Sequence, residues 1–280
     1  MSSYRQITKF CHYLWYQLNF MSKLNSDNIF IDFSDYGRPV ANFIAEHLKS
    51  TKITAIHITM MFGISGILAI YSIFIHSFWA AGVFLIVKSI LDAADGQLAR
   101  AKAKPSFTGR YLDSIFDWVL NFAFLYSIGL QTNTSIGLIL IGFFCMQTQG
   151  TLYNYYHVIL RHSTLGEMTS KIFETKIPIA YPEENQKTVN FLFKCYRLLY
   201  YVFDELIYQL DPLAYKTIRF PKWFMSIVSL YGLGFQLLLI AAFLVLGWIG
   251  NIIPFIIGYT VLLPLLVLIR RYCFIHNNEI

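Results

Sequence analysis

The sequence predicts an all-α, polytopic membrane protein with six transmembrane helices. Of the 280 residues, 56% are hydrophobic, 18% are aromatic and only 14% are charged, whereas about one quarter of the residues in soluble domains are charged. Six stretches reach the roughly 20 mostly apolar residues that a spanning helix needs. They are about Thr54 to Ile75, Phe78 to Ala99, Phe107 to Leu130, Ser135 to Leu160, Trp223 to Trp248 and Ile252 to Ile269.

Residues 1–53 are predicted to form an N-terminal cytoplasmic or interfacial segment, ahead of a membrane domain at 54–275. Within this segment, Tyr36 to Leu48 place apolar side chains at helical spacing between polar ones. This pattern is typical of an amphipathic helix that lies in the membrane interface, and a short solvent-exposed helix is the alternative. No compact apolar run is followed by a small-residue cleavage site, so we expect no cleavable signal peptide.

The segment 161–222 is too charged to span a membrane and too aromatic to be a disordered linker. We interpret it as an interfacial part of the membrane domain. One helix is expected near Gln186 to Gln209, either lying on the membrane or capping a site. Pro178 and Pro182 would break any helix before it.

The distribution of Lys and Arg predicts the orientation, because basic residues accumulate in cytoplasmic loops. The connections near 76–77, 131–134 and 250–251 contain no Lys or Arg, whereas basic residues cluster before the first span, between spans two and three, across 161–222 and at 270–271. Both termini are therefore expected in the cytoplasm. The net charge of +6 fits attraction to anionic membrane lipids. The basic residues form no long run, and we expect no nucleic-acid partner.

Four aspartates interrupt the second and third spans. Asp92 and Asp95 are three residues apart, and Asp113 and Asp117 are four apart, so each pair projects from one helical face. A charge at the centre of a span costs roughly 2.5–3.5 kcal/mol even on a lenient scale. Bound divalent cations would offset this cost, because hard cations prefer carboxylate oxygens. A pair of such ions suits in-line phosphoryl transfer; a proton or ion path in a transporter is the alternative.

The neighbours of these aspartates favour phosphate chemistry. Gly96 and Ala99 lack bulk on the same stretch of helix as Asp95, which leaves room for a base or a diphosphate. Arg100 supplies a fork of donors that matches phosphate oxygens. Gly109 gives the third span a small face for close packing. A transporter has no need of these residues at these spacings.

Together these residues spell DxxDGxxAR, eight residues, then GxxxDxxxD, and the chain thereby resembles the CDP-alcohol phosphotransferase family. The resemblance implies a homodimer and two Mg²⁺ or Mn²⁺ ions per site. Asp92, Asp95 and Asp113 look like the metal ligands, and Asp117 looks both metal-proximal and like the general base. The residues similar to those that hold the CDP donor are Asp92, Gly96, Ala99, Arg100, Ser106 and Gly109.

Two features depart from what the family suggests. Family members often carry Pro-Asn at the start of the first span, where this chain has Ala55–Ile56, followed by His57. This departure weakens any carry-over of donor contacts from that helix. Lys88 lies one turn before Asp92. It can pair with a carboxylate, reach the donor phosphate, or snorkel towards an interface.

The reaction expected from this pattern is transfer of a substituted phosphoryl group from a CDP-linked donor to an alcohol, with release of CMP, in phospholipid synthesis at the cytoplasmic side of a membrane. The donor is either CDP-diacylglycerol, which we favour, or CDP-choline or CDP-ethanolamine acting on a lipid alcohol. A phosphorylated acceptor needs basic residues, and a choline group needs aromatic and acidic walls. The candidates for binding a phosphorylated acceptor are Arg161, Lys171 and Lys176. The candidates for binding a choline group are Tyr153, Tyr155, Tyr156 and Glu167.

Overall fold

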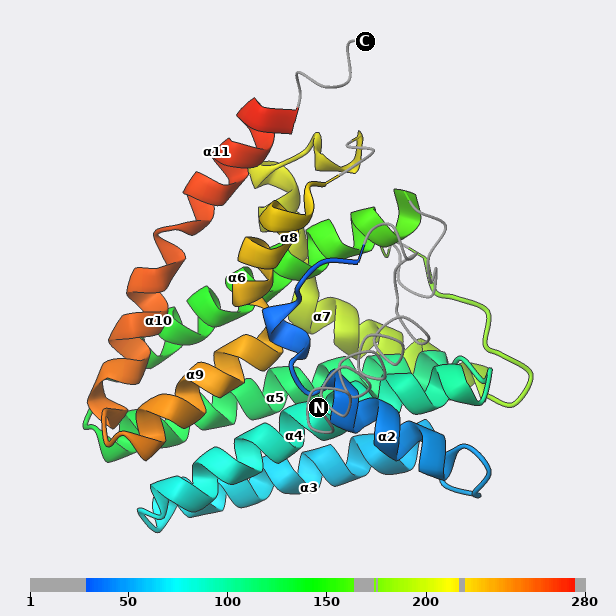
Figure 1. Ribbon diagram of the computed structural model, residues 1–280, viewed down its shortest axis with the longest axis horizontal. Coiled ribbons are helices and arrows are strands. Elements are labelled where there is room, and N and C mark those ends of the chain that lie inside the picture. Colours follow the sequence, from blue (N-terminus) through cyan, green and yellow to red (C-terminus); the bar gives the residue numbers. More distant parts are fainter. Residues whose placement is uncertain (1–28, 164–173, 175, 217–219, 275–280) are drawn as a thin grey trace, which may run out of the picture.

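The computed structural model describes residues 29–163, 174, 176–216 and 220–274, and every regular element in these ranges is helical (Figure 1). Three helices or helix pairs are long and apolar enough to cross a membrane, namely 55–74, 136–162 and 249–272, and a bent pair at 222–245 is a fourth. The all-α membrane fold is thus confirmed. The number of six spans stays a prediction, because α4 (Phe78–Ala101) and α5 (Phe107–Gln131) are long enough but carry the charged residues of the site.

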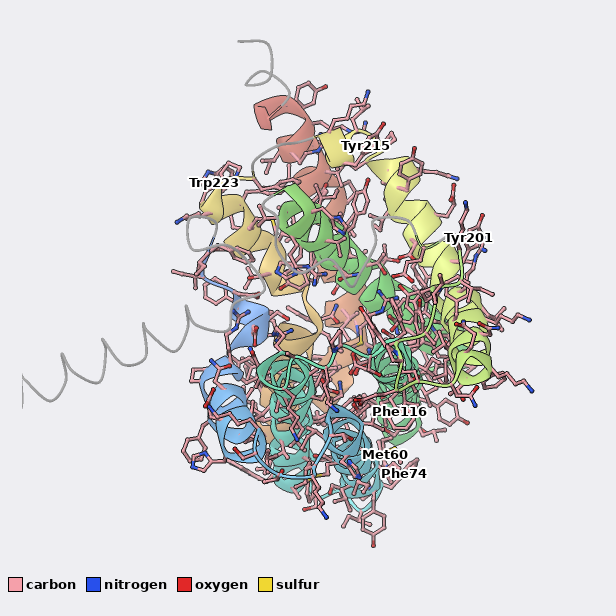
Figure 2. All side chains as sticks on the ribbon, turned by 90° about the vertical axis from the view of Figure 1, so that its right-hand side faces the viewer. Met60, Phe74, Phe116, Tyr201, Tyr215 and Trp223 are labelled. Carbon is pink, nitrogen blue, oxygen red and sulfur yellow. The ribbon has the colours of Figure 1, made fainter. Side chains whose placement is uncertain are left out.

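The core of the molecule is a set of long helices that lie alongside one another: α3 (Ala55–Phe74), α4, α5 and α6 (Ile136–Ser163) (Figure 1). Short turns join them, and the turn residues His76 and Asn133 adopt positive φ. The helices approach closely at Gly66, where an added Cβ would lie 2.6 Å from Leu120. Large apolar side chains remain exposed on the outside, among them Met60, Phe74, Tyr201 and Trp223 (Figure 2).

The expected N-terminal amphipathic helix is present as α2 (Arg38–Leu48). Its small residues Ala41 and Ala45 are buried with Ala94 and Leu98 of α4, while Phe43 is exposed. A short 3₁₀ turn, η2 (Phe33–Asp35), precedes it.

The fifth predicted span, Trp223 to Trp248, is not one helix. It consists of α8 (Lys222–Val228), η4 (Ser229–Tyr231) and α9 (Leu233–Val245), and the two parts are bent by 53°. The cause is residue Gly232, whose extended backbone ends the first part. The η2 segment fills the bend, since Phe33 N donates to Ser229 Oγ at 2.9 Å and Gly234 N donates to Ser34 Oγ at 3.1 Å.

The last predicted span is also divided, into α10 (Ile252–Thr260) and α11 (Leu263–Phe274), with the 3₁₀ turn η5 (Ile249–Asn251) before it. The helix expected near Gln186 to Gln209 is confirmed as α7 (Gln186–Leu210), which packs against α5 and α6. A turn, η3 (Ala214–Lys216), follows α7. Asp211, the C-cap residue of α7, is fully buried, accepts a hydrogen bond from Tyr156 Oη at 2.7 Å, and pairs with Arg270 of α11.

Candidate active site

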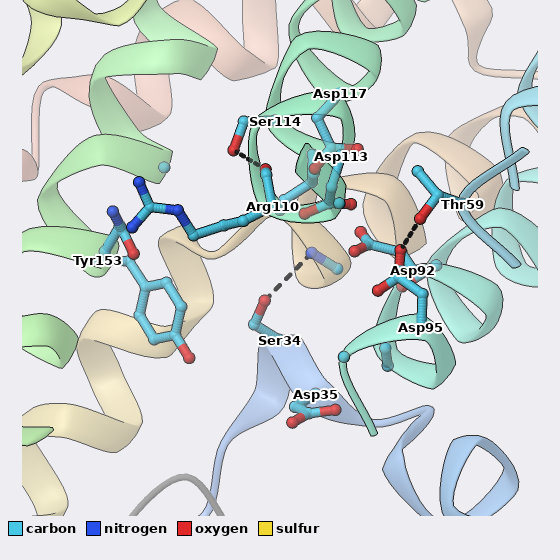
Figure 3. A pocket seen from close by; sticks show the side chains of 18 of the residues that line it. Ser34, Asp35, Thr59, Asp92, Asp95, Arg110, Asp113, Ser114, Asp117 and Tyr153 are labelled. Carbon is cyan, nitrogen blue, oxygen red and sulfur yellow. Dashed lines mark hydrogen bonds between the residues drawn. The ribbon is translucent and has the colours of Figure 1, made fainter. Parts of the chain in front are cut away.

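A cavity of about 410 Å³ lies where these elements meet. Its walls come from α3, α4, α5, α6, α7, α9 and the η2 segment, so that residues more than 200 positions apart in the sequence face the same space. The carboxylates of Asp92, Asp95, Asp113 and Asp117 lie together on one side of it, with Ser34 and Asp35 of η2 on another (Figure 3).

Three of the four aspartates converge. One carboxylate oxygen each from Asp92, Asp95 and Asp113 lie within 4.8 Å of one another. Thr59 of α3 donates a hydrogen bond to Asp95 Oδ2 at 2.6 Å, which orients that carboxylate. Asp113 Oδ1 is buried without a hydrogen-bond partner. Convergent oxygens from three carboxylates, together with an unsatisfied oxygen on Asp113, fit a divalent cation such as Mg²⁺ or Mn²⁺.

Asp117 does not belong to this cluster of three in the described structure. Its Oδ1 instead accepts a hydrogen bond from Lys88 Nζ, which also donates to Asp92 Oδ2 at 3.2 Å. The Lys88 side chain has no exposed surface. Of the three roles open to Lys88 on sequence grounds, pairing with a carboxylate is therefore confirmed. Snorkelling to an interface is wrong, because the two aspartates hold the ammonium inside the protein.

All six residues expected on the donor side line the cavity: Asp92, Gly96, Ala99, Arg100, Ser106 and Gly109. A Cβ added at Gly96 would lie 3.6 Å from the Arg100 guanidinium, so the glycine leaves that face of the helix open beneath the arginine.

Ser106 already has partners. As the N-cap of α5 it accepts a hydrogen bond from Gly109 N at 2.9 Å, and it donates one to Glu184 Oε1 at 2.8 Å. Glu184 also accepts from Thr108 N at 2.7 Å. These bonds lower the pKa of Glu184 although partial burial acts against them. No local sequence pattern predicts these hydrogen bonds, because Glu184 lies 75 residues or more beyond the start of α5, which it caps.

Only some of the residues expected to bind the acceptor line the cavity. Arg161 lines the cavity from the end of α6 and is 5% exposed. Tyr155 does not line it, and that expectation is wrong: Tyr155 lies on the opposite face of α6 and donates to the Asp211 carbonyl at 3.2 Å, because successive helical residues are turned by about 100°. Lys176 is exposed and lies outside the lining. Glu167 and Lys171 fall outside the described residues.

Of the other two aromatic candidates, Tyr153 lines the cavity and donates to Asp32 Oδ2 of the N-terminal segment at 2.6 Å. Tyr156 faces the buried Asp211 instead, like Tyr155.

Several lining residues have no counterpart in the sequence prediction. Asn121 Oδ1 and Gln147 Nε2 are buried without hydrogen-bond partners, and both residues line the cavity. From α7 come Tyr196, Tyr200 and Asp204. Burial, with a smaller contribution from the charge of Glu174, raises the pKa of Asp204 to about 7. Only the tertiary structure brings these groups to the aspartates.

This arrangement defines a class of protein: a helical membrane protein with a carboxylate cluster and an arginine at one cavity. The chain matches the CDP-alcohol phosphatidyltransferase family over residues 52–194, just over half of its length, and it belongs to that family. This membership confirms the resemblance and the phosphotransferase class of enzyme.

The curated relatives are similar to parts of the chain. An archaetidylinositol phosphate synthase of Pyrococcus horikoshii is 37% identical over 87 residues, which are 31% of this chain and 46% of the relative. A bifunctional IPC transferase and DIPP synthase of Archaeoglobus fulgidus is 48% identical over 50 residues, which are 18% of this chain and 10% of the relative. The corresponding protein of Aquifex aeolicus is 37% identical over 54 residues, 19% of this chain and 13% of the relative. The chain thus spans less than half the length of each relative.

Proposed function

We propose that the protein transfers a substituted phosphoryl group from a CDP-linked donor to an alcohol, releasing CMP, in membrane phospholipid synthesis. The observation that carries this proposal is the convergence of the Asp92, Asp95 and Asp113 oxygens within 4.8 Å, in a cavity that Arg100 and Gly96 also line. This is the chemistry that a diphosphate donor needs: a place for a cation, a fork of donors, and an open helix face.

Asp92, Asp95 and Asp113 would hold the divalent metal, Mg²⁺ or Mn²⁺. When bound, such an ion neutralises the charge of the diphosphate and of the departing CMP. Arg100 would bind phosphate oxygens through its planar guanidinium. Gly96 and Ala99 leave space for the nucleotide against α4. Thr59 keeps Asp95 in the orientation seen here through its short hydrogen bond.

Asp117 is the proposed general base. Its carboxylate would take the proton of the acceptor hydroxyl, the acceptor oxygen would form a bond to the phosphorus distal to cytidine, and the bond from that phosphorus to the bridging oxygen would break. CMP leaves with that oxygen. Positioned proton transfer of this kind contributes roughly 10²–10⁴-fold to a rate.

The acceptor side favours a small, hydroxyl-rich acceptor and hence CDP-diacylglycerol as donor. The unsatisfied amide groups of Asn121 and Gln147 offer hydrogen bonds to hydroxyls, and Arg161 offers a charge for an acceptor phosphate. The inositol phosphate in the name of the Pyrococcus relative supports the same class of acceptor.

A second version of the reaction, with a soluble CDP-linked donor, is supported by a different wall of the cavity. Tyr196, Tyr200 and Asp204 form an aromatic and acidic wall on α7, and such walls suit a cationic choline or ethanolamine group. The donor would then be CDP-choline or CDP-ethanolamine, and the acceptor a lipid alcohol.

The deciding experiment offers the purified protein three donors, CDP-diacylglycerol, CDP-choline and CDP-ethanolamine, with Mg²⁺ or Mn²⁺, and measures CMP. We expect CMP from CDP-diacylglycerol with a polyol or polyol phosphate acceptor, and none after chelation. CMP only from the soluble donors would establish the second version. No CMP from any donor across the acceptor panel would favour the transporter alternative.

Two variants separate the roles of the aspartates. Asp95→Asn should weaken both donor binding, measured by calorimetry, and CMP release. Asp117→Asn should lose roughly 10²–10⁴-fold in turnover and retain much of its donor affinity. If Asp117→Asn keeps near-normal turnover, the base is another residue. The homodimer implied by the family stays a prediction that cross-linking in the native membrane would test.

A further inference from the structure

The position of Lys88 is unusual for a lysine in an apolar helix. It lies on α4 one turn before Asp92, and its side chain has no exposed surface. Its ammonium lies between Asp92 Oδ2 and Asp117 Oδ1, and it is 4.8 Å from the centroid of the Phe62 ring. These contacts are the ones expected of a bound cation: two carboxylate oxygens and the face of an aromatic ring.

The four aspartates thus fall into two groups. One carboxylate oxygen each of Asp92, Asp95 and Asp113 lies within 4.8 Å of the other two. Asp117 faces Lys88 instead, and Asp92 contributes to both groups. A second divalent cation bridging Asp92 and Asp117 would need the space and the oxygens that the ammonium already uses.

We infer that Lys88 replaces a second metal ion, so that each site binds one divalent cation, at Asp92, Asp95 and Asp113, with the ammonium as a fixed cation between Asp92 and Asp117. This inference rests on the proposed function and deepens it. Lys88 then acts as a positioning residue, because it holds the proposed base Asp117 at a set place beside the metal ligands.

Displacement of the ammonium by a metal ion is unfavourable for a physical reason. Breaking a buried ion pair leaves an uncompensated charge inside the protein, which is strongly destabilising. Both carboxylates that bind the ammonium would be taken by the entering ion, and the side chain has no exposed surface through which to reach water. The ammonium is also covalently part of α4, so its presence at this position does not depend on the concentration of free metal.

The test is the number of metal ions per chain, measured on the purified protein in detergent with Mn²⁺ as the probe. Bound Mn²⁺ is counted by elemental analysis, and paramagnetic resonance shows whether two ions lie close enough to couple. We expect one uncoupled Mn²⁺ per chain in the native protein and in Lys88→Arg, which keeps the cation. In Lys88→Met the freed Asp92 and Asp117 oxygens should admit a second ion, raising the count to two and producing a coupled signal.

The outcomes distinguish this inference from the proposed function. Two Mn²⁺ ions per native chain, together with CMP release, would overturn the inference and leave the function standing. No bound Mn²⁺ and no CMP release would remove both. A count that stays at one in a folded Lys88→Met protein would show that the ammonium does not exclude the second ion, and the inference would fail. Should Lys88→Met not fold, the counts for the native protein and for Lys88→Arg decide.

Discussion

Replacement of Gly234 by alanine should displace the η2 segment from the bend between α8 and α9. A Cβ added at Gly234 would lie 1.9 Å from the carbonyl oxygen of Ser34 and 3.2 Å from Ser89 Oγ. The nearest atom belongs to the backbone, so no rotamer change relieves the overlap. The segment around Ser34 has to move, and it then loses the hydrogen bonds from Gly234 N to Ser34 Oγ and from Phe33 N to Ser229 Oγ.

The expected loss of stability follows from three terms. Overpacking costs about 1–3 kcal/mol, and each of the two lost hydrogen bonds costs about 1 kcal/mol. Replacing a helical glycine by alanine contributes up to about 1 kcal/mol in the opposite direction. The net destabilisation is about 2–4 kcal/mol, which corresponds to a fall in Tm on the order of 10 °C.

A matched control exists at Gly137. It is the second residue of α6, as Gly234 is the second residue of α9, but a Cβ added there meets nothing within 4 Å. Gly137→Ala should therefore be neutral or slightly stabilising. Thermal unfolding in detergent measures the difference between the two variants, and hydrogen–deuterium exchange reports the Phe33 amide. Its exchange should speed up in Gly234→Ala alone.

The reasoning is refuted if Gly234→Ala is as stable as Gly137→Ala and the Phe33 amide stays as protected as in the native protein. The close approach of Ser34 to Gly234 would then not be what holds η2 in the bend.

Three further predictions concern pH, a buried ion pair and orientation. Burial beside Asp35 raises the pKa of Asp32 to about 6 from an ordinary 3.8. The folded state therefore binds this proton more tightly, and its contribution, up to about 3 kcal/mol, is present below pH 4 and lost as the pH rises through 6. Asp32→Asn should flatten this part of the stability–pH curve, measured by thermal unfolding; unchanged curvature would contradict the assignment. Arg270→Met should cost up to about 3–5 kcal/mol, because it removes the closer of the two arginines that pair with the buried Asp211 and leaves Arg271 at 3.8 Å. Thermal unfolding at the temperature of the native protein would show that the Arg270 pair is not needed. A single cysteine at Asn133 should react with impermeant reagent only from the non-cytoplasmic side of the membrane, and one at Lys102 only from the cytoplasmic side. Equal labelling of both from the non-cytoplasmic side would exclude the predicted topology.

Much of the site could be read from local periodicity. Residues three and four apart share a helical face, so the spacing of Asp92 and Asp95, and of Asp113 and Asp117, was enough to predict two carboxylate pairs on adjacent helices. The same periodicity and the apolar lengths located α3 to α6 within a few residues, and they located α7 as a helix of the interfacial segment. Family membership, confirmed over 52–194, rests on these local patterns.

Local patterns failed where the deciding contact joins distant parts of the chain. The run from Trp223 to Trp248 has the length and hydropathy of one span, yet it is bent at Gly232, and Ser34, 200 residues before Gly234, occupies the space beside these two glycines. Tyr155 was expected at the acceptor pocket, but the rotation of α6 turns it towards the Asp211 carbonyl.

The sequence by itself determined that this protein is helical, lies in a membrane and carries a phosphotransferase signature, because composition, apolar length and helical spacing are properties of short segments. Only the tertiary structure decided which groups share the cavity. Asn121, Gln147 and Asp204 come from three different helices, and Lys88 meets Asp117 across the contact between α4 and α5. The physical reason is that hydrogen bonds and ion pairs depend on distances of about 3 Å. The packing of whole helices sets such distances, and residue spacing along the chain does not.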